Sequence, residues 1–109
     1  MSGNSNDGGG PSISRPSSND NCEDLVIVLN LSSPQAEVIN DLNKGDILSV
    51  QPLTDQGPIQ VLNNEGHIAG TIISREMVRL LNCINNGTDF GAEVLQINGG
   101  QCNVRIFAI

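Results

Sequence analysis

The chain has no Trp and no Tyr, and only two Phe among its 109 residues. A core built from this sequence must therefore be aliphatic, and the surface offers almost no aromatic ring on which a base could stack. Basic residues are also scarce, since five Lys and Arg stand against 12 Asp and Glu, which gives a formal net charge of −7. This charge repels phosphate backbones and anionic membrane surfaces, so nucleic acid is a disfavoured partner.

Membrane-spanning and secretory segments are missing as well. No run of 18 apolar residues is present that could cross a bilayer, and residues 1–16 contain no apolar stretch behind a positively charged start. We therefore expect a soluble protein without a membrane partner, located in the cytoplasm.

The three cysteines Cys22, Cys83 and Cys102 are an odd number and show no C-x-x-C spacing. This pattern indicates neither a disulfide framework nor a zinc knuckle. Buried thiols are the first interpretation, because unpaired cysteine is often found in cores. The alternative is a single bridge between Cys22 and Cys102, which requires the first and last strands to be neighbours.

Composition divides the chain into two parts. Residues 1–21 consist almost entirely of Ser, Gly, Asn, Asp and Pro, which cannot bury enough apolar area to offset the entropy of ordering them. We expect a disordered N-terminal arm there and one small domain over residues 22–109, which is enough chain for a single modest core.

The first half of the domain predicts a strand, a short helix and a second strand. Residues 25–31 read LVIVLNL, which is typical of a strand covered on both faces or forming one side of a closed barrel. Residues 32–34 (SSP) supply a helix start and Gly45 a helix end, with a helix of about two turns between them. Residues 46–51 alternate as a second strand.

The middle of the domain predicts a hairpin. Residues 58–62 and 67–73 have the apolar alternation of two strands, and residues 63–66 (NNEG) form the loop between them. Gly70 lies inside the returning strand, where glycine marks a bulge or a close backbone approach.

The last part predicts a helix followed by a second hairpin. Ser74 caps the helix, Gly87 ends it, and apolar residues at the i, i+3, i+4, i+7 spacing form its inner face, namely Met77, Leu80, Leu81 and Ile84. Residues 98–100 (NGG) then join two alternating strands. About six short strands and two helices result, so we expect a mainly β (α+β) domain, a small curved antiparallel sheet or partly open barrel.

Catalytic and metal-binding patterns are not evident. His67 is the only histidine, it follows a glycine at the start of a strand, and an exposed imidazole without a role is its ordinary outcome. The carboxylates are spaced singly along the chain, so no metal-ligand loop and no acid/base pair is indicated. We therefore predict a protein that is not an enzyme, with no catalytic residues, no metal and no cofactor.

Two segments resemble the HIRAN family. They are residues 55–81 (DQGPIQVLNNEGHIAGTIISREMVRLL) and residues 87–106 (GTDFGAEVLQINGGQCNVRI), which together cover roughly half the chain. The resemblance implies a small β-barrel that, in some members, captures the 3′ end of single-stranded DNA with aromatic and basic residues. The usual Asn-Pro-Tyr run before the Asp is missing here. The corresponding set would be Arg75, Arg79, Lys44, Arg105, Phe90 and Phe107.

Two functional hypotheses follow from the sequence. The first is a binding or adaptor module that recognises a protein partner through an acidic surface. The alternative is a HIRAN-type module that binds ends of single-stranded DNA, for which the basic residues would have to gather on one face.

Overall fold

The computed structural model describes residues 21–109, so the expected arm of residues 1–21 lies outside the described residues except for Asn21. The described chain contains one 3-10 turn, six strands and two helices. In chain order they are η2 Cys22–Asp24, β2 Val26–Asn30, α1 Ala36–Ile39, β3 Ile47–Pro52, β4 Ile59–Leu62, β5 Ile68–Ile72, α2 Met77–Asn85, β6 Phe90–Asn98 and β7 Gln101–Ala108. The expected fold class is confirmed.

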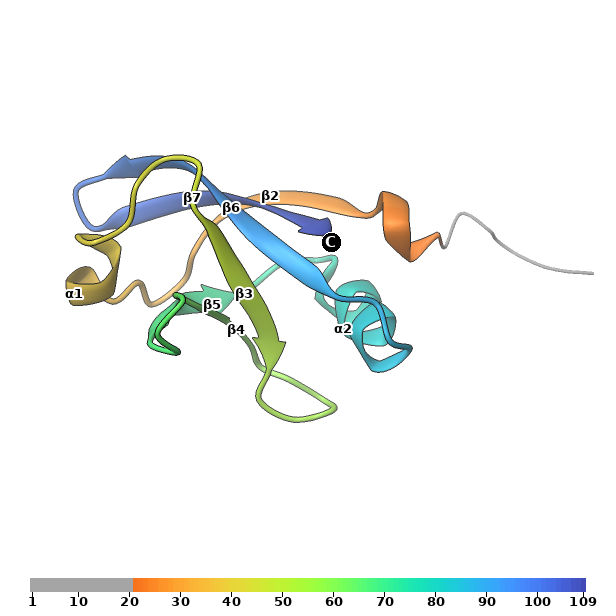
Figure 1. Ribbon diagram of the computed structural model, residues 1–109. Helices are drawn as coiled ribbons and strands as arrows, with labels where there is room; N and C mark the ends of the chain where they lie inside the picture. Colours follow the sequence, from red (N-terminus) through yellow and green to blue (C-terminus); the bar gives the residue numbers. More distant parts are fainter. Residues whose placement is uncertain (1–20) are drawn as a thin grey trace, which may run out of the picture.

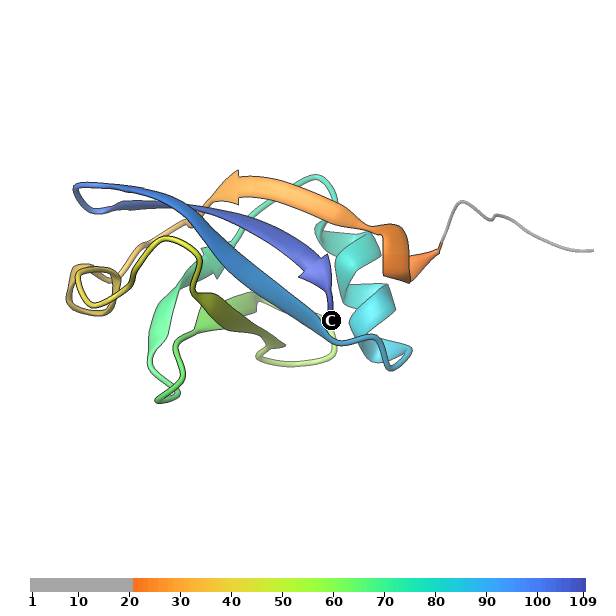
Figure 2. The same ribbon diagram turned by 45° about the horizontal axis from the view of Figure 1, so that its top comes forward.

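All six strands belong to one antiparallel sheet with the order β2-β7-β6-β3-β4-β5. The sheet curls strongly, so that its two outer strands approach each other (Figures 1 and 2). Directly after β2, the Ser32 N–H donates to the Thr71 carbonyl at 2.8 Å and the Thr71 N–H donates to the Ser32 carbonyl at 2.8 Å. This bridge joins the outer strands at one end. Within residues 21–109 no strand pairing spans the rest of the gap between β2 and β5, which we term the β2–β5 seam.

The inner face of the curled sheet forms the core. Alternate side chains of each strand point inward, as period-2 patterning requires, and Ile59, Val61 and Ile106 are fully buried. Phe90 is the aromatic residue among them, so the core is aliphatic as the composition requires. Burying aliphatic side chains is the main stabilising contribution in a domain of this size.

Gly70 allows the two outer strands to meet. A Cβ atom at this position would lie 2.8 Å from the Leu31 Cβ and 3.1 Å from the Ser32 carbonyl oxygen. The pairing of β4 with β5 also shifts register beside it, between Val61 and Leu62. The sequence-based expectation of a bulge or a close backbone approach at Gly70 is confirmed in both forms.

Helix α2 lies at the other end of the half-barrel (Figures 1 and 2). Leu80 and Cys83 are buried, and Met77, Leu81 and Ile84 pack against the core from the same face. The face of α2 that the spacing predicts to be buried is therefore the face that packs against the core. Ser74 does not cap the helix directly; its hydroxyl accepts from the Glu76 N–H at 3.1 Å, and α2 begins only at Met77.

The helix expected after residues 32–34 is shorter than predicted. Helix α1 spans only Ala36–Ile39, and its N-cap residue Gln35 makes no side-chain cap. Ser32 is used in the bridge to Thr71 instead, and Ser33 has a positive φ of 48°. Long-range strand pairing thus overrides the local capping signal of the two serines.

The strand at residues 25–31 is covered on one face only. Ile27 is buried in the core, whereas Val26 and Val28 are 54% and 57% exposed. The expectation of coverage on both faces is therefore wrong, because no second layer of the described chain packs on the outside of the sheet. The other expectation for this segment, a strand that forms one side of a barrel, agrees with the position of β2 at the edge of the curled sheet.

The cysteine interpretation needs correction. Cys22 and Cys83 form a disulfide, with a Cα–Cα distance of 5.6 Å, that ties η2 to α2. The alternative bridge between Cys22 and Cys102 does not form, although β2 and β7 are neighbours. Cys22 precedes β2, whereas Cys102 lies beside Leu31, just after the other end of β2. Burial raises the pKa of the Cys102 thiol above its ordinary value.

Candidate functional site

An acidic groove runs between helix α1 and the hairpin loop that joins β4 to β5. One part of it is a cleft of about 390 Å³ whose lining includes Asp41, Asp46 and Glu65. An adjoining depression of about 440 Å³ shares Asp41 and Glu65 and adds Glu37 and His67. We define the acidic groove by these five residues.

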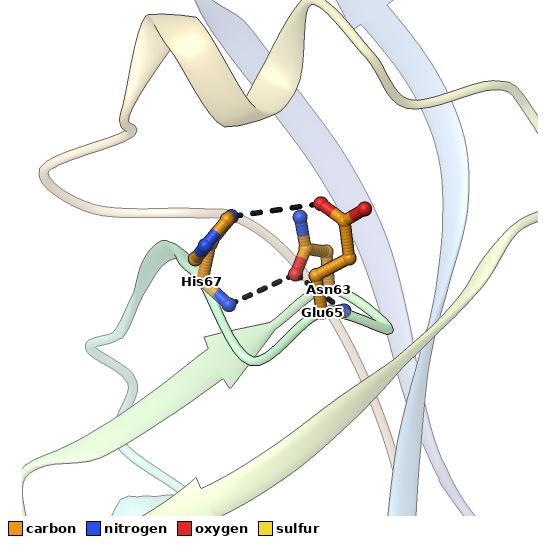
Figure 3. A network of polar contacts seen from close by, with 3 residues as sticks. All are labelled: Asn63, Glu65 and His67. Carbon is orange, nitrogen blue, oxygen red and sulfur yellow. Dashed lines mark hydrogen bonds and ion pairs between the residues drawn. The ribbon is translucent and has the colours of Figure 1, made fainter.

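One asparagine side chain fixes the conformation of the hairpin loop. The Asn63 Oδ1 accepts from the Glu65 N–H at 2.9 Å and from the His67 N–H at 2.9 Å, as Figure 3 shows. The Asn63 N–H also donates to the His67 carbonyl at 2.9 Å. Asparagine favours such turns because its side chain replaces a backbone acceptor. The loop therefore presents Glu65 and His67 to the groove in a defined conformation.

The opposite wall is fixed through the sheet. The Val94 N–H donates to the Asp46 carbonyl at 2.8 Å, and the Gly45 N–H donates to the Val94 carbonyl at 2.8 Å. The Asp46 Oδ2 in turn accepts from the Asn43 N–H at 2.8 Å. Asp46 is thus anchored by its backbone to β6 and by its side chain to the preceding turn.

Helix α1 supplies Glu37, and the turn directly after it supplies Asp41. The Gln35 N–H donates to the Ala69 carbonyl at 2.9 Å, which holds the start of α1 against β5. Ile39 is fully buried and anchors the helix in the core. Glu37 and Asp41 stay exposed on the side that faces the groove.

The groove carries four carboxylates and one imidazole, and these groups are exposed or half-buried. The shortest link between them joins the His67 Nδ1 to a Glu65 Oε1 at 3.7 Å, and both side chains are more than half exposed. Within residues 21–109 no cluster of three or more His, Cys, Asp and Glu is arranged to hold a metal ion. Electrostatic attraction of a cationic ligand is what this arrangement can provide.

The basic residues proposed for nucleic-acid binding fall into separate groups. Arg75 lies just before α2 and Arg79 lies on it, and both line one cleft of about 620 Å³ together with Cys22. Lys44 lies in the loop between α1 and β3. In Figures 1 and 2 this loop lies at the opposite end of the molecule from α2. Arg105 lies on β7, on the outer face of the sheet.

The two phenylalanines are not placed for base stacking on a common surface. Phe90 is 3% exposed and belongs to the core. Phe107 is half-buried beneath the Arg105 guanidinium, which lies 5.1 Å from the ring centroid. Arg105 also donates to the Glu93 carboxylate at 2.6 Å. The Phe107 ring is therefore covered by the Arg105 guanidinium, and this guanidinium is already paired with Glu93.

Sequence reasoning missed the acidic groove. Asp41 and Asp46 lie in the connection between α1 and β3, and Glu65 lies in the loop between β4 and β5. The sequence shows them as separately spaced carboxylates, because only the curled sheet brings the two segments together. The usable signal was the distribution of charge, since Asp46 directly follows the predicted helix end at Gly45 and Glu65 lies in the predicted hairpin loop.

Comparison of this chain with protein families, with curated protein sequences and with solved structures finds no match. The residues and contacts of the acidic groove are therefore the basis for inferring function. Among residues 21–109, no helix has the length and apolarity needed to cross a membrane.

Proposed function

We propose that this protein is a non-enzymatic binding module that recognises a basic segment of a partner protein through the acidic groove. The observation that carries the proposal is that three carboxylates of residues 37–46 and Glu65 of the β4–β5 loop lie along one groove. A partner with Lys or Arg side chains would meet an attractive potential there.

The geometry of the groove supports binding more than catalysis. General acid/base chemistry uses groups whose proton affinities are shifted by burial or by close neighbours. His67 is instead largely exposed and lies 3.7 Å from a single exposed carboxylate. No cofactor is required by the proposal.

A titration with a fluorescent peptide that contains four lysines would test this function. We expect binding that weakens steeply as salt is raised from 50 to 500 mM, since exposed charges are screened over about 10 Å or less. The double variant D41N/E65Q should bind about fivefold more weakly, because each exposed ion pair contributes about 0.5 kcal/mol.

The matched control is D55N, which removes one exposed carboxylate from the loop between β3 and β4, outside the acidic groove. Its affinity for the peptide should stay within about twofold of the unchanged chain. The double control E23Q/D55N removes two exposed carboxylates outside the groove. If it lost as much affinity as D41N/E65Q, only net charge would matter, and the proposal would fail.

A second candidate, HIRAN-type binding of single-stranded DNA ends, is favoured by one observation. Arg75 and Arg79 share the cleft of about 620 Å³ beside Cys22. The burial of Phe90 and the pairing of Arg105 with Glu93 weigh against the full set. Anisotropy with short single strands at low salt, compared between the unchanged chain and R75Q, tests this candidate.

The cytoplasmic location expected from the sequence is also a proposal, and the disulfide bears on it. Cytoplasmic thiol systems keep most cysteines reduced, whereas oxidising compartments preserve disulfides. A cytoplasmic protein would therefore contain Cys22 and Cys83 as a dithiol. Trapping thiols with an alkylating reagent at the moment of cell lysis and counting the modified cysteines by mass spectrometry would decide between the two states.

A further inference from the structure

The direction of the backbone groups of β2 follows from the contacts at its end. The Leu31 N–H donates to the Cys102 carbonyl at 2.9 Å, towards β7, whereas the Ser32 N–H donates to Thr71 on the other side. Backbone groups of successive strand residues alternate in direction. Leu29 and Ile27 therefore face β7, and the N–H and C=O groups of Val26, Val28 and Asn30 face the β2–β5 seam.

On the side of the seam, these three residues have no strand partner in the described part of the chain. The register of β2 pairs it with β7 alone, and the only bridge across the seam joins Ser32 to Thr71 within residues 21–109. Continuing that bridge would bring Asn30 opposite Ile73. The side chain of Ile73 is instead 66% exposed, and the chain turns away from the seam into α2.

The outer face beside this seam carries exposed apolar side chains, with Arg105 opposite Val28 as the charged neighbour. Val26 and Val28 are more than half exposed, and the register places Phe107 next to Val26. Ile47 and Ile109 then cover the position of Gly91, since their methyl groups lie 3.0 and 3.1 Å from where its Cβ would be. An exposed apolar patch that adjoins unpaired strand groups is typical of an interaction site.

We propose that β2 accepts an extended strand from a partner protein along the β2–β5 seam. The N–H and C=O groups of Val26, Val28 and Asn30 would pair with the backbone of that strand, and Val26 and Val28 would pack against its outward side chains. This surface is separate from the acidic groove, so the inference does not depend on the function proposed above.

The chemistry of the partner segment follows from the same residues. Alternate β-branched apolar side chains match Val26 and Val28 across a strand pair. Glu23 and Asp24 are exposed immediately before β2, and the formal net charge of the chain is −7, so the segment is basic at the end beside them. All sheet neighbours are antiparallel, which puts the basic end at the C-terminus of the segment.

Hydrogen exchange of the full chain with a synthetic probe tests the proposal. The probe is the capped peptide Thr-Val-Thr-Val-Thr-Lys-Lys, and the control is Thr-Pro-Thr-Pro-Thr-Lys-Lys, which has the same charge but cannot form a strand. At ten times the dissociation constant, exchange at Val26, Val28 and Asn30 should slow about tenfold with the probe. With the control peptide it should stay unchanged.

The variant V28P removes the central N–H of the exposed edge. Because this N–H faces away from β7, proline leaves the β2–β7 hydrogen bonds in place, as it does on other edge strands. The probe should then lose at least tenfold in affinity, whereas V28T should stay within twofold of the unchanged chain. If V28P folds poorly, the proposal is still tested by the hydrogen exchange of the unchanged chain with the probe and the control peptide.

Three results would overturn the proposal. One is probe binding that perturbs only Asp41, Glu65 and their neighbours, which would assign the peptide to the acidic groove. Another is the absence of added protection at millimolar probe. The third is protection of the same three amides that rises with protein concentration alone, because a second copy of the chain would then be the occupant. Retained protection in D41N/E65Q would support the strand site even if the groove failed.

Discussion

The two ends of the β2–β5 seam are closed by different means. At one end the backbone N–H and C=O groups of Ser32 and Thr71 form two hydrogen bonds. Gly70, beside Thr71, leaves the space that this close approach needs. At the other end no strand pairing spans the gap between residues of the described chain, and α2 is held by the packing of Leu80 and by the Cys22–Cys83 disulfide. The first closure needs a close approach of two main chains, whereas the second needs side chains and a covalent bond.

This difference predicts where the domain is tolerant of change. A closure made by backbone groups fails when a side chain intrudes, and a closure made by packing fails when a side chain is removed. At the Ser32–Thr71 end, substitution by a larger residue should lower the free energy of unfolding. At the α2 end, substitution by a smaller residue should lower it.

Loss of the disulfide should have the largest effect. The bond links residues 61 apart in sequence, and a loop of this length corresponds to about 4 kcal/mol of the free energy of unfolding. Urea unfolding of the chain with and without a reducing agent measures this contribution. The double variant C22S/C83S should match the reduced chain and should no longer respond to the reductant; identical midpoints for the oxidised and reduced chains would refute the role of the bond.

Removal of the buried leucine of α2 should have the next largest effect. Leu80 is fully buried, so L80A should lower the free energy of unfolding by about 3 kcal/mol through lost burial and a residual cavity. Val78 on the same helix is 70% exposed, and V78A should change it by less than about 0.5 kcal/mol. Comparable losses in both variants would show that α2 does not close this end by packing.

Addition of a methyl group at the backbone closure should follow. G70A would place its Cβ 2.8 Å from the Leu31 Cβ, and we expect a loss of about 2 kcal/mol in denaturant unfolding. Gly100 in the last hairpin has nothing within 4 Å of an added Cβ, so G100A is the control and should be close to neutral. A neutral G70A would contradict the close approach of the two chains.

The smallest expected effect concerns alkaline pH at the backbone-closed end. Burial raises the pKa of the Cys102 thiol in the folded chain, so the unfolded chain loses this proton first as pH rises. The free energy of unfolding should therefore decline once pH exceeds the ordinary thiol pKa. The chain has no Tyr to titrate in this range, and C102A should lack this decline. Denaturant unfolding between pH 7 and 10 provides the comparison.

Local patterns predicted the elements that local interactions determine. The spacing of Met77, Leu80 and Ile84 identified the inward face of α2, and alternation identified the strands of both hairpins. The serines at residues 32 and 33 were misassigned to a helix cap because their partner lies on β5, far away in sequence. A capping pattern alone carries no information about such a partner.

The candidate site was harder to predict for the same reason. Asp46 and Glu65 belong to different turns, and their proximity depends on the order of β3, β4 and β5 in the curled sheet. Cys22 and Cys83 were likewise not paired from spacing, since the sequence does not reveal that α2 lies beside η2.

The described chain begins and ends on the α2 side of the molecule, whereas α1 and the β4–β5 loop lie on the opposite side (Figure 1). Attachment to a larger assembly, a support or a fused protein through Asn21 or Ile109 would thus direct the acidic groove outward. A tethered copy would keep this groove accessible to ligands in solution.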